Sequence, residues 1–206
     1  MGEVWAIVVA AGAGRRFGGA KQFEPLLGRR VVDWSLAAAQ AACDGVVPVL
    51  PPDRLEPGAQ PGGATRSGSV RAGLAAVPDN AEIVVVHDAA RPLARPELFA
   101  RVIAAVRAGA DAAIPVIPVA DTIKRVSGDR VTETVDRMTL VAVQTPQAFR
   151  AEALRKAHAE ELEATDDAAL VEAVGGIVVT VAGDSGNFKL TTPDDLVVAA
   201  VLLARR

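Results

Sequence analysis

The stretch "AIVVAAGAGRRFGGAKQF", residues 6–23, decides the fold class of this chain. It opens with a run of apolar residues and passes directly into a loop with four glycines and the cations Arg15, Arg16 and Lys21. In α/β proteins, ligands bind in the crevice outside the carboxyl ends of the strands. The stretch therefore predicts a buried strand followed by a ligand-binding loop.

Working outward, short β-branched runs alternate with alanine-rich helical patterns along the chain. The predicted strands are 4–9, 46–50, 83–86, 112–119 and 177–181, and the predicted helices are 31–42, 67–77, 96–108 and 193–203. Strands that alternate with helices imply crossover connections and a mainly parallel sheet. We therefore expect one α/β domain over residues 1–206, a three-layer sandwich around a Rossmann-like sheet.

A second polar cluster, "HDAARP" at 87–92, follows the predicted strand 83–86. The carboxyl ends of parallel strands meet at one edge of a sheet, so this cluster and the glycine loop should lie together. That edge is the predicted site.

Residues 119–140 break the alternation of strands and helices. They alternate apolar and polar residues around a Ser-Gly-Asp turn, which predicts a two-stranded hairpin. Its apolar residues are few, and an isolated hairpin is marginal in water. We expect an arm that packs on a second subunit.

Composition narrows the class of protein. Hydrophobic residues make up 50% of the chain and charged residues 23%, and the net charge of −3 gives no basic field for nucleic acid. The single cysteine, Cys43, favours a reducing compartment. The apolar run 4–11 has no basic flank, and no stretch approaches the roughly 20 apolar residues of a membrane span. We expect a cytoplasmic protein that binds neither nucleic acid nor membrane.

The glycine loop admits several interpretations. Gly12, Gly14 and Gly18 come near the dinucleotide fingerprint but miss its spacing, and Asp33 lies in a predicted helix instead of ending a strand. An ATP P-loop fails because no Gly-Lys-Ser/Thr is present. A loop whose backbone N–H groups and cations wrap a triphosphate fits, and a solvated turn is the plain alternative.

Eight blocks of the sequence resemble the 2-C-methyl-D-erythritol 4-phosphate cytidylyltransferase family, in that family's order. They are "AAGAGRRFGGAKQF" (10–23), "GGATRSGSVRAGL" (62–74), "VVVHDAARP" (84–92), "ADTIKRV" (120–126), "TVDR" (134–137), "QTPQAF" (144–149), "ATDDAALVE" (164–172) and "GNFKLTTPDDL" (186–196). The resemblance implies a nucleotidyltransferase domain that couples CTP to methylerythritol phosphate, with Mg²⁺ as cofactor and a homodimer as the assembly. The products are CDP-methylerythritol and pyrophosphate, in non-mevalonate isoprenoid synthesis.

The resemblance also implies a role for individual residues. The nucleotide would contact Ala10, Ala11, Gly12, Ala13, Gly14, Gly63, Ser69, Asp88 and Ala89. The catalytic cations would be Arg16, Lys21 and Lys189, and Asp88 would also hold the metal. The acceptor would contact Arg91, Thr122, Arg137 and Thr165, with Thr122 and Arg137 reaching across the dimer.

The chemistry itself calls for cations. A phosphate monoester is already an anion at neutral pH, so its attack on a triphosphate needs charge neutralisation and not a general base. Accordingly, we predict that His87 packs or positions and that His158, on a charged helix, is solvated. Asp166 and Asp167 are predicted to complement a helix dipole.

The chain departs from the family's pattern at two places. The segment 51–61 is short and rich in proline, so an edge strand should be missing or reduced. Ala64 stands where the family often has an acidic residue, and Thr65 is the candidate to replace that residue.

A cytidylyltransferase for another polyol phosphate, such as ribitol 5-phosphate, is the nearest alternative function. A nicotinamide-dependent reductase and a non-catalytic relative are more remote, and the retained Arg16, Lys21, Asp88 and Lys189 argue against the latter.

Overall fold

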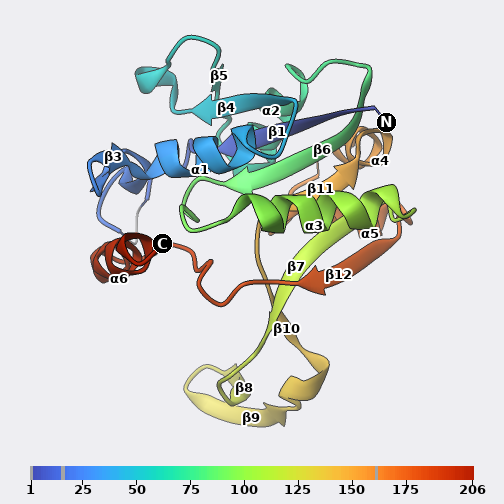
Figure 1. Cartoon of the computed structure of the whole chain (residues 1–206). Helices are drawn as coiled ribbons and strands as arrows, with labels where there is room; N and C mark the ends of the chain where they lie inside the picture. Colours follow the sequence, from blue (N-terminus) through green and yellow to red (C-terminus); the bar gives the residue numbers. More distant parts are fainter. Residues whose placement is uncertain (1, 15–16, 161) are drawn as a thin grey trace.

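The apolar runs of the sequence form the centre of the sheet in Figure 1. The computed structural model describes residues 2–14, 17–160 and 162–206. Within them the strand order is β10-β7-β11-β6-β1-β4-β5, and β12 pairs with β7. The strands are β1 (Glu3–Val9), β4 (Gly45–Leu50), β5 (Gln60–Pro61), β6 (Ala81–Asp88), β7 (Ala112–Pro118), β10 (Val141–Val143), β11 (Gln147–Arg150) and β12 (Val178–Ala182). Strand β1 pairs in parallel with both β4 and β6, which places the ends of β1 and β6 at one edge.

Helices cover both faces of this sheet. Alternate residues of β1 point to opposite faces: Val4, Ala6 and Val8 join one core cluster and Ile7 joins the other. The first cluster includes α1 (Val31–Gln40) and α3 (Pro96–Arg107). The second includes α2 (Arg66–Leu74), α4 (Ala151–His158) and α5 (Asp167–Ala173). The predicted three-layer α/β architecture is confirmed.

The C-terminal helix α6 (Pro193–Ala204) lies beside these layers and packs on a small hairpin, β2 (Pro25–Leu26) and β3 (Arg29–Arg30). Leu26, Val31 and Leu203 share a third core cluster there. Thr192 and Asp195 form a capping box at the start of α6, with Thr192 three residues after Lys189. Among the described residues, no helix has the length and apolar character needed to cross a membrane.

Two features of the sheet depend on local chemistry. The edge strand β5 has two residues, and its segment carries several prolines, which cannot donate to a ladder. The predicted reduction of this edge is confirmed. Strands β10 and β11 run antiparallel to β7, and β11 separates β7 from β6; the sequence analysis did not predict them. Each is too short for its apolar pattern to stand out.

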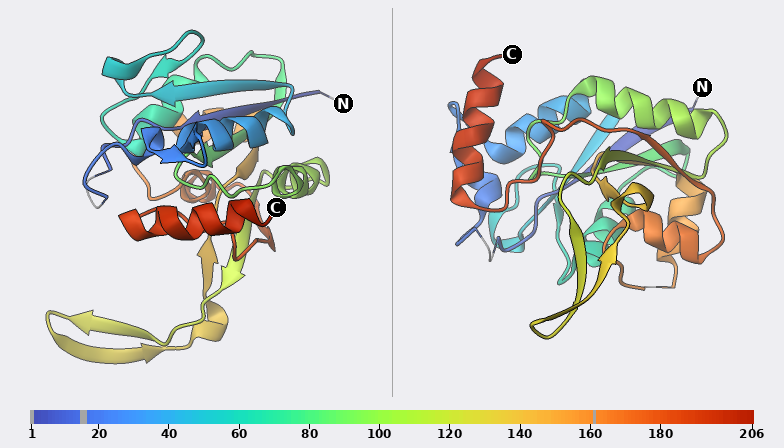
Figure 2. Two further views of the ribbon diagram at one scale, coloured as in Figure 1. Left: turned by 60° about the vertical axis from the view of Figure 1, so that its left-hand side comes forward. Right: turned by 90° about the horizontal axis from the view of Figure 1, so that it is seen from below.

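The predicted hairpin is confirmed and projects from the body as an arm, as Figures 1 and 2 show. Strands β8 (Ile123–Ser127) and β9 (Arg130–Val135) form a separate two-stranded sheet. Gly128 at the turn has φ +61°, a conformation that favours glycine. Val126 and Val131 are 59% and 55% exposed, so the arm has no core of its own.

Candidate active site

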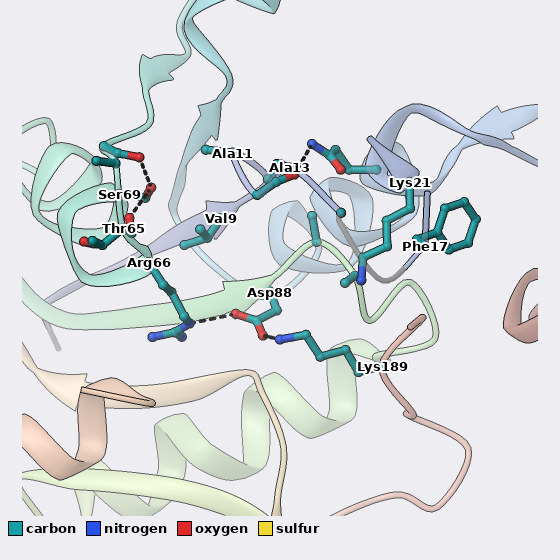
Figure 3. A pocket seen from close by; sticks show the side chains of 18 residues that line it. Val9, Ala11, Ala13, Phe17, Lys21, Thr65, Arg66, Ser69, Asp88 and Lys189 are labelled. Carbon is teal, nitrogen blue, oxygen red and sulfur yellow. Dashed lines mark hydrogen bonds and ion pairs between the residues drawn. The ribbon is translucent and has the colours of Figure 1, made fainter. Parts of the chain in front are cut away.

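A pocket of about 430 Å³ opens at the carboxyl edge of β1 and β6, shown in Figure 3. Its wall includes residues 10–14, Lys21, Gly63, Ser69, Asp88, Ala89 and Lys189. These come from four separate parts of the chain. The glycine loop and the strand-end cluster therefore meet, as the sequence predicts.

The conformation of the glycine loop requires glycine. The Gly14 carbonyl accepts the N–H groups of Phe17, Gly18 and Gly19 at 2.9, 3.1 and 3.3 Å, which folds the loop tightly. Gly14 has φ +63°, and a Cβ there would lie 1.8 Å from the Gly19 carbonyl oxygen. A side chain at this position would open the loop.

The opposite wall of the pocket is the start of α2. Thr65 caps this helix by accepting the Gly68 N–H at 3.0 Å. Gly63 packs against the same turn, because a Cβ on Gly63 would lie 2.7 Å from the Gly68 carbonyl carbon. The glycine brings the backbone close and leaves space for a ligand beside Ser69.

Asp88 lies between two cations at the floor of the pocket (Figure 3). Lys189 Nζ is 2.6 Å from Asp88 Oδ2, and Arg66 Nε is 3.2 Å from Asp88 Oδ1. Burial raises the pKa of this carboxyl, but the charges of Arg66 and Lys189 outweigh burial and hold the pKa well below its usual range. Asp88 is therefore ionised at neutral pH.

The two lysines of the pocket converge from opposite ends of the chain. Lys21 begins a short 3₁₀ turn after the glycine loop and donates a hydrogen bond to the Leu190 carbonyl, next to Lys189. Both side chains line the pocket. Their charges favour an anion there.

Behind Asp88 the charges continue into the protein. Arg66 also donates from Nη1 to Asp167 Oδ2 at 2.8 Å. The other oxygen of Asp167 is 3.0 Å from His158 Nε2, and Asp167 has no exposed area. Burial lowers the pKa of Arg66, but Asp88 and Asp167 outweigh it and the net shift is upward.

A second pocket, of about 310 Å³, adjoins the first. The two share Arg66, Asp88 and Lys189, and the second adds Arg91 and Thr165. Arg91 is held by the Asn187 carbonyl at 2.8 Å, and burial lowers its pKa against the opposing charge of Asp88. Two ligands placed in these pockets would meet at the shared ionic groups.

Comparisons with known proteins agree with this geometry. Residues 4–205 match a family model described as 2-C-methyl-D-erythritol 4-phosphate cytidylyltransferase. A protein of that name from Nocardia farcinica is 47% identical over 223 residues, covering 100% of this chain and 96% of that protein. The chain belongs to this family.

Other members give the same result. The crystal structure of the cytidylyltransferase from Thermus thermophilus superposes with a TM-score of 0.84 at 40% identity, covering 97% of this chain and 98% of that one. A "Bifunctional enzyme IspD/IspF" from Dinoroseobacter shibae is 47% identical over 219 residues. The match covers 99% of this chain and 54% of that relative, so the chain spans about half the length of this bifunctional protein.

The structure places the predicted residues of the cytidylyltransferase site in three groups. The predicted nucleotide contacts, with Lys21 and Lys189, line the first pocket, and Arg91 and Thr165 line the second. Arg16 lies outside the described residues. Thr122 and Arg137 lie at the base of the arm and line neither pocket; Arg137 donates to the Ala120 carbonyl. Their predicted role depends on a second subunit.

Arg66 is a site residue that was not predicted from the sequence, although it lies in one of the quoted blocks. A cation in the first turn of a helix is unfavourable beside the helix dipole, so its position signals a carboxylate partner. The structure supplies two, Asp88 and Asp167. The predicted helix begins at residue 67, one residue after the true start of α2, so this signal appears only once the helix boundary is known.

The prediction that His158 is solvated is wrong. His158 is 4% exposed, because it lies on the face of α4 that also buries Ala151 and Leu154. Of the charged residues around it that suggest a surface position, Lys156 lies on the exposed side of α4, whereas Glu160 and Glu163 follow the end of the helix. For Asp166 and Asp167 the prediction is half confirmed: Asp166 caps α5 through the Ala169 N–H at 3.0 Å, whereas Asp167 is buried in an ion pair.

His87 is a packing residue, as predicted. It has no exposed area, its Nδ1 is 3.1 Å from Thr145 Oγ1, and its ring packs against Phe99. Burial lowers the pKa of His87 to about 4, with Arg91 contributing in the same direction and Asp88 opposing. The ring is therefore neutral at pH 7.

Thr65 does not simply replace an acidic residue at position 64. Its hydroxyl caps α2 and bonds Glu163 Oε1 at 2.9 Å, and Arg71 holds the same carboxylate at 2.9 Å. An acidic group therefore lies beside this turn, but it comes from a segment about a hundred residues later in the chain. Sequence spacing gives no sign of it.

Proposed function

We propose that this chain couples CTP to 2-C-methyl-D-erythritol 4-phosphate, releasing pyrophosphate, with the nucleotide in the first pocket and the acceptor in the second. The observation that carries this proposal is the pair of adjoining pockets that share Arg66, Asp88 and Lys189. Two anionic substrates must meet at their reacting phosphates, and the charged groups lie where the pockets join. Family membership supports the identity of both substrates.

The proposed mechanism relies on neutralisation of charge. Lys21 and Arg16 hold the triphosphate, and Lys189 stabilises the phosphate under attack. Backbone N–H groups of the glycine loop bind the leaving phosphates as they gain charge. No general base is required, because the acceptor phosphate is already ionised, and the neutral His87 is consistent with this.

The donor set at Asp88 fits a magnesium ion shared with the nucleotide. Among the described residues, no group of three or more His, Cys, Asp or Glu side chains could hold a metal by itself. Mg²⁺ is commonly bound by one or two carboxylates together with substrate phosphates and water, and Asp88 is an ionised carboxylate in the nucleotide pocket. When bound, the ion would neutralise charge on the triphosphate.

We further propose a cytoplasmic homodimer in which each arm completes the acceptor pocket of its partner. The exposed valines of the arm and the position of Thr122 and Arg137 outside both pockets support this assembly. A twofold arrangement lets both sites borrow the same residues. The single cysteine supports the location.

The test is pyrophosphate release from CTP and Mg²⁺ with a panel of acceptors. We expect turnover with methylerythritol phosphate and at least tenfold less with ribitol 5-phosphate. Omission of the acceptor controls for CTP hydrolysis. Turnover of ribitol 5-phosphate without turnover of methylerythritol phosphate would show that the acceptor is wrong.

A further inference from the structure

The two oxygens of Asp88 have different surroundings. Oδ2 contacts Lys189, whose side chain is 39% exposed and can move toward a ligand. Oδ1 contacts Arg66, whose side chain is 23% exposed and is bound at a second point inside the protein. One contact can exchange, and the other is fixed.

The fixed contact is anchored by groups that touch neither pocket. Arg66 Nη1 donates to Asp167 Oδ2 at 2.8 Å, and His158 Nε2 lies 3.0 Å from Asp167 Oδ1. Asp167 and His158 come from α5 and α4, are 0% and 4% exposed, and line neither of the two site pockets. An ionised carboxylate only accepts hydrogen bonds, so His158 donates here.

We propose that Arg66 is a positioning residue for the metal carboxylate, and that Asp167 and His158 hold it in place. By fixing Oδ1, Arg66 orients Asp88 so that Oδ2 faces the cation when Lys189 turns to the reacting phosphate. This inference rests on the proposed role of Asp88 as the magnesium ligand. It assigns a positioning role at that site to Arg66, and a supporting role to Asp167 and His158, which line neither pocket.

The physical reason is the geometry of the guanidinium group. Its planar fork reaches Asp88 and Asp167 at the same time, which a lysine ammonium on a flexible stem cannot reproduce. Without the fork, the Asp88 carboxylate can rotate, and part of the energy of metal binding goes into orienting it. Partners that orient metal ligands typically change metal affinity by about 10–100-fold when they are removed.

The experiment compares variants along this chain of contacts. Asp167→Asn, His158→Leu and Arg66→Lys should each weaken Mn²⁺ binding to the protein–CTP complex about tenfold, measured without acceptor by proton relaxation. Their turnover with Mg²⁺ should recover when Mg²⁺ is raised, so that the apparent Mg²⁺ constant changes more than kcat does. His158→Gln keeps an N–H donor and should bind Mn²⁺ nearly as the parent does.

Arg71→Lys is the matched control. Arg71 lies on the same helix and pairs with Glu163 at 2.9 Å, and no hydrogen bond or ion pair joins it to Asp88 or Asp167 among the described contacts. It should leave Mn²⁺ binding unchanged. All variants are measured below their unfolding midpoints, so a loss of stability alone does not alter the metal constant.

The inference is overturned if folded Asp167→Asn and Arg66→Lys proteins bind Mn²⁺ as the parent does while Asp88→Asn binds it more weakly. In that case Asp88 is still the metal ligand, but Arg66 does not position it. Parent-like binding by Asp88→Asn would remove the metal site and this inference together. Cytidylyl transfer itself is judged separately, by the acceptor panel.

Discussion

An arginine–carboxylate pair with a nitrogen–oxygen distance of 2.8 Å occurs both behind the candidate active site and in the hairpin arm. Behind the site, Arg66 and Asp167 have side chains that are 23% and 0% exposed. In the arm, Arg125 and Glu133 are 67% and 54% exposed. The distance is the same, but water screens the exposed pair much more than the buried pair. The two pairs should therefore contribute different amounts to the free energy of unfolding when one partner is removed.

The comparison extends to the apolar residues of the two regions. The body has core clusters of buried valines, leucines and other apolar residues on both faces of the sheet. The arm leaves Val126, Val131 and Met138 open, with Met138 at 85% exposure. The body has an apolar core on each face of its sheet, whereas the arm has none, and its exposed apolar side chains fit the proposed contact with a second subunit.

The largest effect should come from Arg66→Met. This change leaves the buried Asp167 carboxylate without its cation, so the free energy of unfolding should fall by about 3–5 kcal/mol in urea titration. Arg125→Met removes the exposed pair and should cost less than about 1 kcal/mol. Equal losses in the two variants would contradict the comparison.

A smaller effect, on activity alone, is expected for Lys21→Ala. The lysine follows the glycine loop and lines the first pocket, which is the proposed nucleotide pocket, so turnover should fall on the order of 100-fold while the unfolding midpoint stays close to that of the parent. Lys156→Ala, on the exposed face of α4, is the matched control and should keep full activity. Near-normal turnover by a folded Lys21→Ala protein would contradict this role and support the alternative that the loop is a solvated turn without a ligand.

The smallest effect on folding is expected in the arm. Replacing Val126 and Val131 by serine should shift sedimentation from the proposed dimer to a monomer, yet change the free energy of unfolding of the body by about 0.5 kcal/mol or less. Val198→Ser, a 50% exposed valine on α6, should leave the dimer intact. Unchanged sedimentation of the double variant would show that these valines do not form the interface.

The sequence predicts the layers and the glycine loop because their signals are local. Apolar periodicity marks β1 and α3, and the glycines and cations of residues 10–23 adjoin in the chain. Lys189 is identified only by the family resemblance, since no spacing in the sequence links it to Lys21.

The misses share a physical cause, which is dependence on distant partners. Strand β11 forms because β6 and β7 flank it on both sides. The buried His158 contacts a carboxylate on another helix, Asp167 on α5. Helical periodicity groups His158 with Ala151 and Leu154, whereas the charged residues beside it in the sequence favour a surface position. Such contacts are fixed by tertiary packing and not by local composition.

The most direct test of the shared site is complementation in mixed dimers. An Arg137→Ala chain has a damaged arm and a sound glycine loop, and a Lys21→Ala chain has the reverse. Each parent alone should be nearly inactive, whereas verified mixed dimers should regain one working site per pair. No recovery in such dimers, or full activity from a sedimenting monomer, would contradict the account.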